Sequence, residues 1–256
     1  DELGRDIDHY ADPNGKKVAD AKGNVDSETT AYTEGGVWTY SGTDMATLQT
    51  VWKAKEFTIV FEGNAPEDAS TKITGEMRNQ VVSTGSSRSL EKNAFVLPGY
   101  KFTGWNTEPD GYGDEYEDGA TVEDDLFLEA NFDNTIKLYA QWEPQTYEVK
   151  FEAVDGTGAM EPQTFVFDQE AALDRNEFNP PGSGDYTPSF LYWQGSDKNT
   201  YLDGEVVTNL CTTEGETGKV TGLTLTAQWS TENVVVITIT NNGEPVMLSN
   251  PSEDIK

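Results

Sequence analysis

The chain has 256 residues, and its 46 acidic residues against 17 basic ones give a formal net charge of −29 at neutral pH. Because such a surface repels nucleic-acid phosphates and anionic lipid head groups, the charge argues against nucleic acid as a partner. Hydrophobic residues make up 35% and aromatic residues 11%, so we expect several small units whose thin cores are built on large rings. The single cysteine, Cys211, excludes an internal disulfide and a multi-thiolate metal site. No apolar run reaches the ~18 residues of a membrane span, so we expect no membrane insertion by this segment.

Residues 1–55 are expected to be the later part of a diverged repeat unit. The segment from Tyr10 to Gly15 carries turn residues, Gly35-Gly36 marks a second turn, and residues 37–52 are expected to hold the closing strands. His9, the only histidine, falls in this region. We expect it to be a lone surface residue, because a catalytic triad needs a base that a third group orients.

Two segments of alternating apolar residues are predicted to be strands. They are Phe57-Thr58-Ile59-Val60-Phe61 and Tyr147-Glu148-Val149-Lys150-Phe151. Alternation with a period of two puts the rings and aliphatic side chains on one face of a strand. Val234 to Ile239 is a third predicted strand, of ambiguous register. Ser87 to Ala94 is the best candidate for a short helix, with a serine N-cap and Pro98 beyond its end.

A five-residue motif that ends in tryptophan recurs along the chain. Leu138-Tyr139-Ala140-Gln141-Trp142 returns as Leu225-Thr226-Ala227-Gln228-Trp229, and a weaker copy ends at Trp52, so the three tryptophans are 90 and 87 positions apart. Phe102-Thr103-Gly104-Trp105 likewise matches Phe190-Leu191-Tyr192-Trp193, and an Asp-Gly turn follows each. We predict two full repeat units, 56–143 and 144–229, between the partial unit 1–55 and the start of a further β-rich unit at 230–256. The tryptophans predicted to form the cores, rather than exposed stacking platforms, are Trp105, Trp142, Trp193 and Trp229.

This pattern resembles the Listeria–Bacteroides repeat, also called the internalin B-repeat, of bacterial surface proteins. The residues that carry the resemblance run from Pro98-Gly99-Tyr100 to Thr107 and from Leu138 to Trp142. The second unit departs from the pattern, because five extra residues separate Pro181-Gly182 from Phe190, and Tyr192 replaces the motif glycine.

Fold class and location follow from these observations in two steps. The amino acids by themselves predict a mostly β chain of small, mainly antiparallel units. The resemblance implies a mostly β, small α+β class, with tandem β-grasp-like repeat domains in an elongated, monomeric array. It further implies a location on the bacterial cell surface, with attachment to the cell wall through parts outside this segment.

Residue patterns that would support catalysis are missing from the sequence. There is no Gly-rich phosphate loop, no HExxH and no zinc spacing, and Cys211 has no basic neighbour to activate it. A glycosidase would need two carboxylates held across a cleft, which units of this size rarely enclose. We therefore predict no enzyme activity and no catalytic, cofactor-binding or metal residues. The acidic loop from Glu108 to Gly119 is the best candidate for Ca²⁺, with millimolar affinity at most, because its counterpart at 195–204 has lost most of the acids.

The sequence favours a stalk or spacer that also takes part in adhesion. An alternative is a binding module for a host surface protein or a glycan, because amphipathic rings suit interfaces and sugar stacking. The candidate contact residues are Tyr112, Tyr116, Tyr186 and Tyr201. A third interpretation is an accessory region of a larger secreted enzyme.

Overall fold

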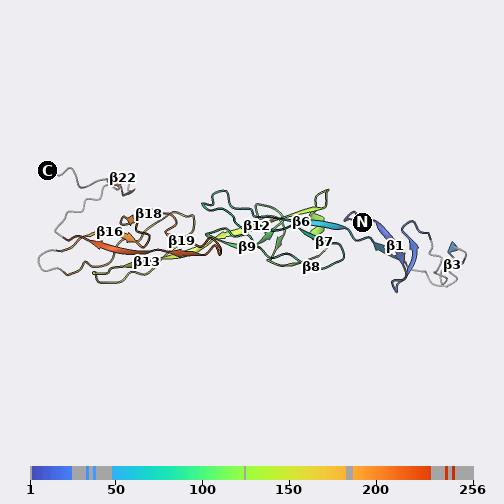
Figure 1. Ribbon diagram of the computed structural model, residues 1–256, viewed down its shortest axis with the longest axis horizontal. Coiled ribbons are helices and arrows are strands. Elements are labelled where there is room, and N and C mark those ends of the chain that lie inside the picture. The colour runs from blue at the N-terminus through green and yellow to red at the C-terminus, as the bar shows by residue number, and fades with distance from the viewer. Residues whose placement is uncertain are drawn as a thin grey trace. The chain divides into compact units, whose positions relative to one another are not determined.

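The computed structural model describes residues 2–24, 33–34, 37–38, 48–123, 125–182, 187–231, 240–241 and 244–245. These residues are mostly β, and the helical element among them is a short 3-10 turn, η1 (Leu126–Glu129), which confirms the predicted mostly-β class (Figure 1). The helix predicted over Ser87 to Ala94 is wrong. Strand β8 (Arg88–Ser89) lies there and pairs with β11 (Thr121–Val122), and the next amide, that of Leu90, donates to Ala120 O rather than to a helical turn.

A five-stranded sheet with the order β10-β9-β12-β6-β7 follows the N-terminal region. Its strands are β6 (Glu56–Glu62), β7 (Gln80–Ser83), β9 (Tyr100–Asn106), β10 (Glu115–Tyr116) and β12 (Thr135–Pro144). The strands that come first and last along the chain, β6 and β12, are neighbours in the sheet and run parallel, with Ile59 opposite Ile136. The predicted inward face of β6 is confirmed, because Phe57, Ile59 and Phe61 are all buried.

A second five-stranded sheet has the order β17-β16-β21-β13-β14. Its strands are β13 (Thr146–Glu152), β14 (Gln163–Val166), β16 (Phe190–Gly195), β17 (Thr200–Tyr201) and β21 (Thr224–Trp229). Again the first and last strands run parallel, with Phe151 opposite Leu225. The buried face of β13 is the predicted one, formed by Tyr147, Val149 and Phe151. Strand for strand, this order is the same as that of the first sheet.

The N-terminal residues form a smaller sheet with the order β2-β1-β5. Its strands are β1 (Ile7–Ala11), β2 (Lys17–Asp20) and β5 (Gln49–Trp52). Two-stranded ladders complete the described structure, and they join β3 (Thr33–Glu34) to β4 (Val37–Trp38), β15 (Ala171–Ala172) to β18 (Val206–Val207), β19 (Cys211–Thr213) to β20 (Val220–Gly222), and β22 (Thr240–Asn241) to β23 (Glu244–Pro245). The strand predicted over Val234 to Ile239 lies outside the described residues.

The chain divides into two compact units that each combine separate segments. Unit 1 comprises residues 1–62, 77–93 and 105–139, and unit 2 comprises residues 63–76, 94–104 and 140–256. The predicted segment 144–229 therefore lies wholly in unit 2, whereas the predicted segment 56–143 contributes to both units. The predicted boundaries of the repeats stay a prediction.

The core of each unit is built around one fully buried tryptophan. Trp105 is 1% exposed and Trp193 is 0% exposed, so for these two residues the predicted core position is confirmed. The other two, Trp142 and Trp229, are half-buried and pack against the core cluster of unit 2. Each lies edge-on to a phenylalanine, with ring centroids 5.6 Å apart for Phe102–Trp142 and 5.9 Å apart for Phe190–Trp229.

Candidate functional site

The four predicted contact tyrosines differ widely in exposure. Tyr112 is 91% exposed, on the loop that joins β9 to β10. Tyr116 and Tyr201 are half-buried, and Tyr186 lies outside the described residues. Of the three described rings, only that of Tyr112 presents most of its surface to solvent.

Tyr116 and Tyr201 occupy equivalent positions on the edge strands β10 and β17. Each lies opposite the buried tryptophan of its sheet, since Tyr116 pairs with Trp105 and Tyr201 pairs with Trp193. Burial, reinforced by nearby carboxylates, raises the pKa of each phenol to about 12. The Tyr201 hydroxyl also donates to Asp197 Oδ2 at 2.7 Å. These two rings therefore pack at the sheet edge, and we expect them to contribute more to stability than to ligand contact.

The acidic loop that begins at Glu108 is held from within by Asn106, whose side chain is fully buried. Asn106 Nδ2 donates to the carbonyl oxygens of Gly111 and Gly113 at 3.0 and 3.2 Å. Its Oδ1 accepts from the amides of Glu108 and Gly113, both at 2.9 Å. One asparagine thus fixes the backbone that presents Tyr112. Among the residues that the structure describes, no three His, Cys, Asp or Glu side chains gather closely enough to hold a metal ion.

The densest side-chain network of unit 2 surrounds Asp168. Its carboxylate accepts from Ser70 N at 2.9 Å, Ser70 Oγ at 2.5 Å, Tyr100 OH at 2.9 Å and Asn209 Nδ2 at 2.6 Å. The Asp168 amide in turn donates to Asn209 Oδ1 at 2.7 Å. We call these four residues the clasp, because they join the segments 63–76 and 94–104 to the second sheet.

The electrostatics of the clasp favour an ionised aspartate. Partial burial by itself raises the pKa of Asp168, but the hydrogen bonds from Ser70, Asn209 and Tyr100 outweigh it and hold the pKa below its usual range. Burial and the neighbouring carboxylate both raise the pKa of Tyr100. The same two causes raise the pKa of the Cys211 thiol to about 11, so this half-buried cysteine stays protonated and unreactive near neutral pH.

A single residue, Gln145, links β12 to β13, and its backbone groups and its side-chain Nε2 all form hydrogen bonds. Its amide donates to Gly99 O at 2.8 Å, and its carbonyl accepts from Phe167 N at 2.9 Å. Its side-chain Nε2 donates to Tyr100 O at 2.9 Å and to Gly218 O at 2.8 Å. The turn at Gly99 is tightly covered, because an added Cβ there would lie 2.2 Å from the Phe167 ring. Both the link and the turn beside it are therefore locked into unit 2.

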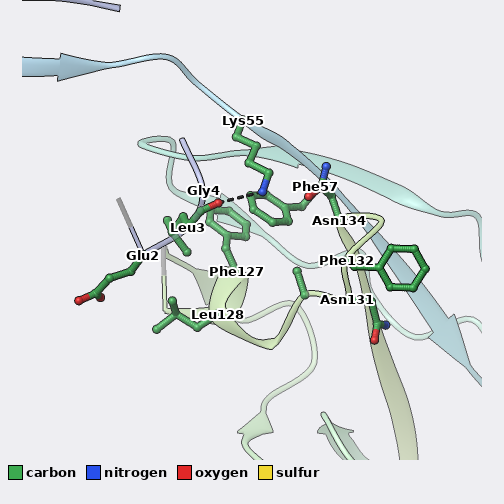
Figure 2. Close-up of a pocket in the computed structure, with 11 residues that line it drawn as sticks. Glu2, Leu3, Gly4, Lys55, Phe57, Phe127, Leu128, Asn131, Phe132 and Asn134 are labelled. Atoms are coloured by element: carbon green, nitrogen blue, oxygen red, sulfur yellow. Dashed lines mark hydrogen bonds between the residues drawn. The ribbon is translucent and has the colours of Figure 1, made fainter. Parts of the chain in front are cut away.

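A pocket of about 290 Å³ lies in unit 1, beside the N-terminal turn (Figure 2). Phe57 and Phe127 stack in its wall with their ring centroids 4.7 Å apart. Lys55 Nζ lies 5.0 Å from the centre of the Phe57 ring and donates to Leu3 O at 2.8 Å. Phe132, at 102% exposure, lines the pocket from its outer side. The walls of this pocket therefore present aromatic surface and the hydrogen-bonded ammonium group of Lys55. Among the described lining residues, no two groups are arranged for proton transfer.

His9 lies on strand β1 rather than in an irregular loop, and its side chain is 20% exposed. Its Nδ1 is 2.6 Å from Asp8 Oδ2. The predicted lone surface histidine is therefore partly buried on the sheet β2-β1-β5.

Comparison with known proteins gives partial similarity to two long proteins of Evansella cellulosilytica. One, named "Putative Gly-rich membrane protein", is 32% identical over 120 residues, which are 47% of this chain and 13% of the relative. The other, named "Putative membrane protein", is 30% identical over 97 residues, which are 38% of this chain and 13% of the relative. This chain thus corresponds to a small part of each relative's length. No family model matches the chain, and no solved structure is significantly similar to it. Among the described residues, no helix is long and apolar enough to cross a bilayer.

The clasp is the feature that sequence reasoning missed. Its members lie at positions 70, 100, 168 and 209, and three of the four sit in loops or turns where polar residues are ordinary. One signal was available, since Tyr100 belongs to the Pro98-Gly99-Tyr100 motif that carries the resemblance. The partner residue, Asp168, has a backbone φ of 59°, which sequence does not reveal.

Proposed function

We propose that this chain is a non-enzymatic spacer from a bacterial cell-surface protein, built from tandem β-grasp-like repeats. The shared strand order of the two five-stranded sheets supports the repeat assignment. So does the N-terminal order β2-β1-β5, which is the same as the β10-β9-β12 part of the first sheet. Trp142 and Trp229 also support it, because each lies edge-on to the phenylalanine at the same motif position.

The observation that carries the spacer function is the one-residue link at Gln145. Strand β12 ends at Pro144 and β13 begins at Thr146, so successive repeats are joined without a flexible linker. Side chains of the preceding segments, Leu97 and Tyr100, are buried in the same cluster as the second sheet. A chain whose neighbouring modules share buried surface keeps its direction, which is what a stalk requires.

The names of the two relatives support a location at the cell envelope. Both are called membrane proteins, and in both the similar stretch is a small fraction of the length. We propose that this chain likewise belongs to a longer surface protein, in which it separates a functional domain from the cell. The strongly negative charge suits this role, because it disfavours lateral association of neighbouring stalks.

Distance measurement between two spin labels tests the spacer proposal. Labels at Phe132→Cys and Val154→Cys, both highly exposed positions in different units, are placed in a Cys211→Ser background. We expect a narrow distribution of distances in the full chain, which Gln145→Ala broadens. The matched control is Gln228→Ala, because that side chain bonds only a near neighbour, Thr226 O. A broad distribution before any loosening substitution would contradict a stiff spacer.

One observation favours adhesion as a second role. The Asn106-held loop presents an almost fully exposed ring, Tyr112, at low conformational cost. A glycan array probed with the full chain tests this role, with Tyr112→Ala as the variant and Phe132→Ala as the exposed-ring control. Binding that Tyr112→Ala alone abolishes supports a ligand at this loop, whereas no binding to any glycan leaves the spacer role by itself.

A further inference from the structure

The N-terminal turn in unit 1 corresponds to the locked turn at Gly99 in unit 2. Ile7 on β1 lies opposite Trp52, as Phe190 on β16 lies opposite Trp229. Since Phe102 and Phe190 are the same motif position, Ile7 also matches Phe102. Counting back from them places Gly4 at the position of Gly99, and both glycines have positive φ, 66° and 92°.

Lys55 occupies the position of Gln145 at the first junction, the link between β5 and β6; the second junction is the link between β12 and β13. Each residue comes directly before the first strand of a five-stranded sheet. Lys55 Nζ donates to Leu3 O at 2.8 Å, as Gln145 Nε2 donates to Tyr100 O at 2.9 Å. At both junctions, therefore, a side-chain nitrogen donates to a carbonyl oxygen of the turn, at neighbouring rather than identical positions, and the backbone carbonyl accepts from the strand beside it, from Thr84 N in one case and from Phe167 N in the other.

An apolar side chain that fills the second junction has a charged counterpart at the first. Leu97 is fully buried, whereas Glu2, which takes its place, is exposed, and Figure 2 shows its carboxylate pointing away from the stacked rings. The pocket of about 290 Å³ lies beside Glu2, and Phe57 and Phe127 form part of its wall. An apolar side chain that is buried at one junction is thus replaced by a vacancy at the other.

The carboxylate of the clasp has no counterpart at the matching position of the first junction. Phe57 lies opposite Val82, as Tyr147 lies opposite Phe165, so Val82 and Phe165 are at matching positions. Two positions further on Thr84 matches Phe167, and the next residue, Gly85, matches Asp168. The Phe167 ring lies edge-on to Tyr100 with centroids 5.8 Å apart. At the first junction the smaller Thr84 replaces this ring. Gly85, whose φ is 73°, brings no carboxylate.

We propose that the chain holds one yielding junction and one locked junction, and that the empty side-chain position beside Glu2 makes the first junction yield. Three residues, 53–55, link β5 to β6, whereas the single residue Gln145 links β12 to β13. This inference rests on the proposed repeat array and adds to it where such a stalk bends. A stalk with one yielding junction can reorient the domain that it carries.

Amide hydrogen exchange on the full chain, resolved by residue, tests the contrast. The reporters at the first junction are the amides of Lys53, bonded to Asp6 O, and Lys55, bonded to Thr84 Oγ1. Those at the second are the amides of Gln145 and Gly99, bonded to Gly99 O and Gly218 O. We expect the first pair to exchange at least about tenfold faster, because local opening there breaks fewer packed contacts. Equal rates at the two junctions would overturn the proposal.

Three substitutions separate the effect of the empty side-chain position from a general loss of stability. Glu2→Leu supplies the missing apolar side chain and is expected to slow exchange of Lys53 and Lys55 severalfold, while Glu2→Gln, which removes only the charge, leaves it unchanged. No slowing in Glu2→Leu, or equal slowing in Glu2→Gln, contradicts the role given to the vacancy. Ser70→Ala, at an exposed clasp position, is expected to speed exchange at Gly99 and leave Lys53 unaffected. Broad spin-label distances would defeat the spacer proposal, whereas narrow distances with equal exchange rates at the two junctions would overturn this inference alone, so the two failures are distinguishable.

Discussion

At the scale of single residues, the rings of this chain fall into two classes that sequence does not separate. Trp193 is fully buried and lies 5.0 Å, between ring centroids, from both Phe151 and Phe190. Its Nε1 has no hydrogen-bond partner among the described residues, so its contribution comes from packing. Tyr112, by contrast, touches mainly water.

Truncation of the two rings should therefore have very different costs. We expect Trp193→Ala to lower the free energy of unfolding by about 3–5 kcal/mol, because it leaves a cavity at the centre of unit 2. Trp193→Phe should cost clearly less, since it keeps one aromatic ring, leaves a smaller cavity and breaks no described hydrogen bond of the indole N–H. Tyr112→Ala, the exposed control, should stay within about 0.5 kcal/mol. Chemical denaturation measures all three, and a comparable loss in Trp193→Ala and Tyr112→Ala would contradict the assignment of the core.

At the scale of elements, the clasp predicts how the attachment of the 66–71 loop depends on pH. Asp168→Asn keeps the backbone, because asparagine tolerates the φ of 59° found there, but removes the charge that four donors share. We expect this variant to lose about 1–3 kcal/mol of unfolding free energy at neutral pH. The folded-state pKa of Asp168 lies below the usual 3.8, so its stabilisation is complete above that value and is lost as the pH falls through the folded pKa. Urea unfolding of both proteins from about pH 7 down to about pH 2 measures the difference, and a gap that does not narrow toward the acid end of this range would show that charge is not its source.

Strands and turns of this chain were predictable from sequence where a local rule decides them. Alternation gave the buried faces of β6 and β13, and the two Asp-Gly turns have the expected positive φ, 74° at Gly119 and 72° at Gly204. The helix predicted near Ser87 failed because pairing with β11 outweighs a serine cap over so short a segment. The clasp and the pocket depend on side chains brought together across more than 60 positions, as in the Tyr100–Asp168 bond, and no local pattern encodes such contacts.

The replacement of a glycine by Tyr192 is a case where the structure supplies the missing reason. Gly104 has a φ of 151°, which favours glycine. Tyr192, at the matching point of β16, does not have a positive φ, so the backbone takes a different local conformation there. The motif glycine is therefore dispensable in this strand, and its loss is not by itself evidence against the repeat.

At the scale of the whole molecule, the net charge of −29 predicts a strong but unspecific response to salt. Mutual repulsion of the carboxylates opposes the compact state, and it is screened over about 10 Å at 0.1 M ionic strength. We therefore expect NaCl to raise the thermal unfolding midpoint, and CaCl₂ and MgCl₂ at matched ionic strength to act alike. The reason is that the acidic loop after Asn106 is already closed by its own asparagine, and among the described residues its carboxylates do not converge. Differential scanning calorimetry compares the three salts. A calcium-specific rise, or a micromolar isotherm by titration calorimetry, would show that the loop gathers its acids around the ion and that calcium stabilises the folded chain.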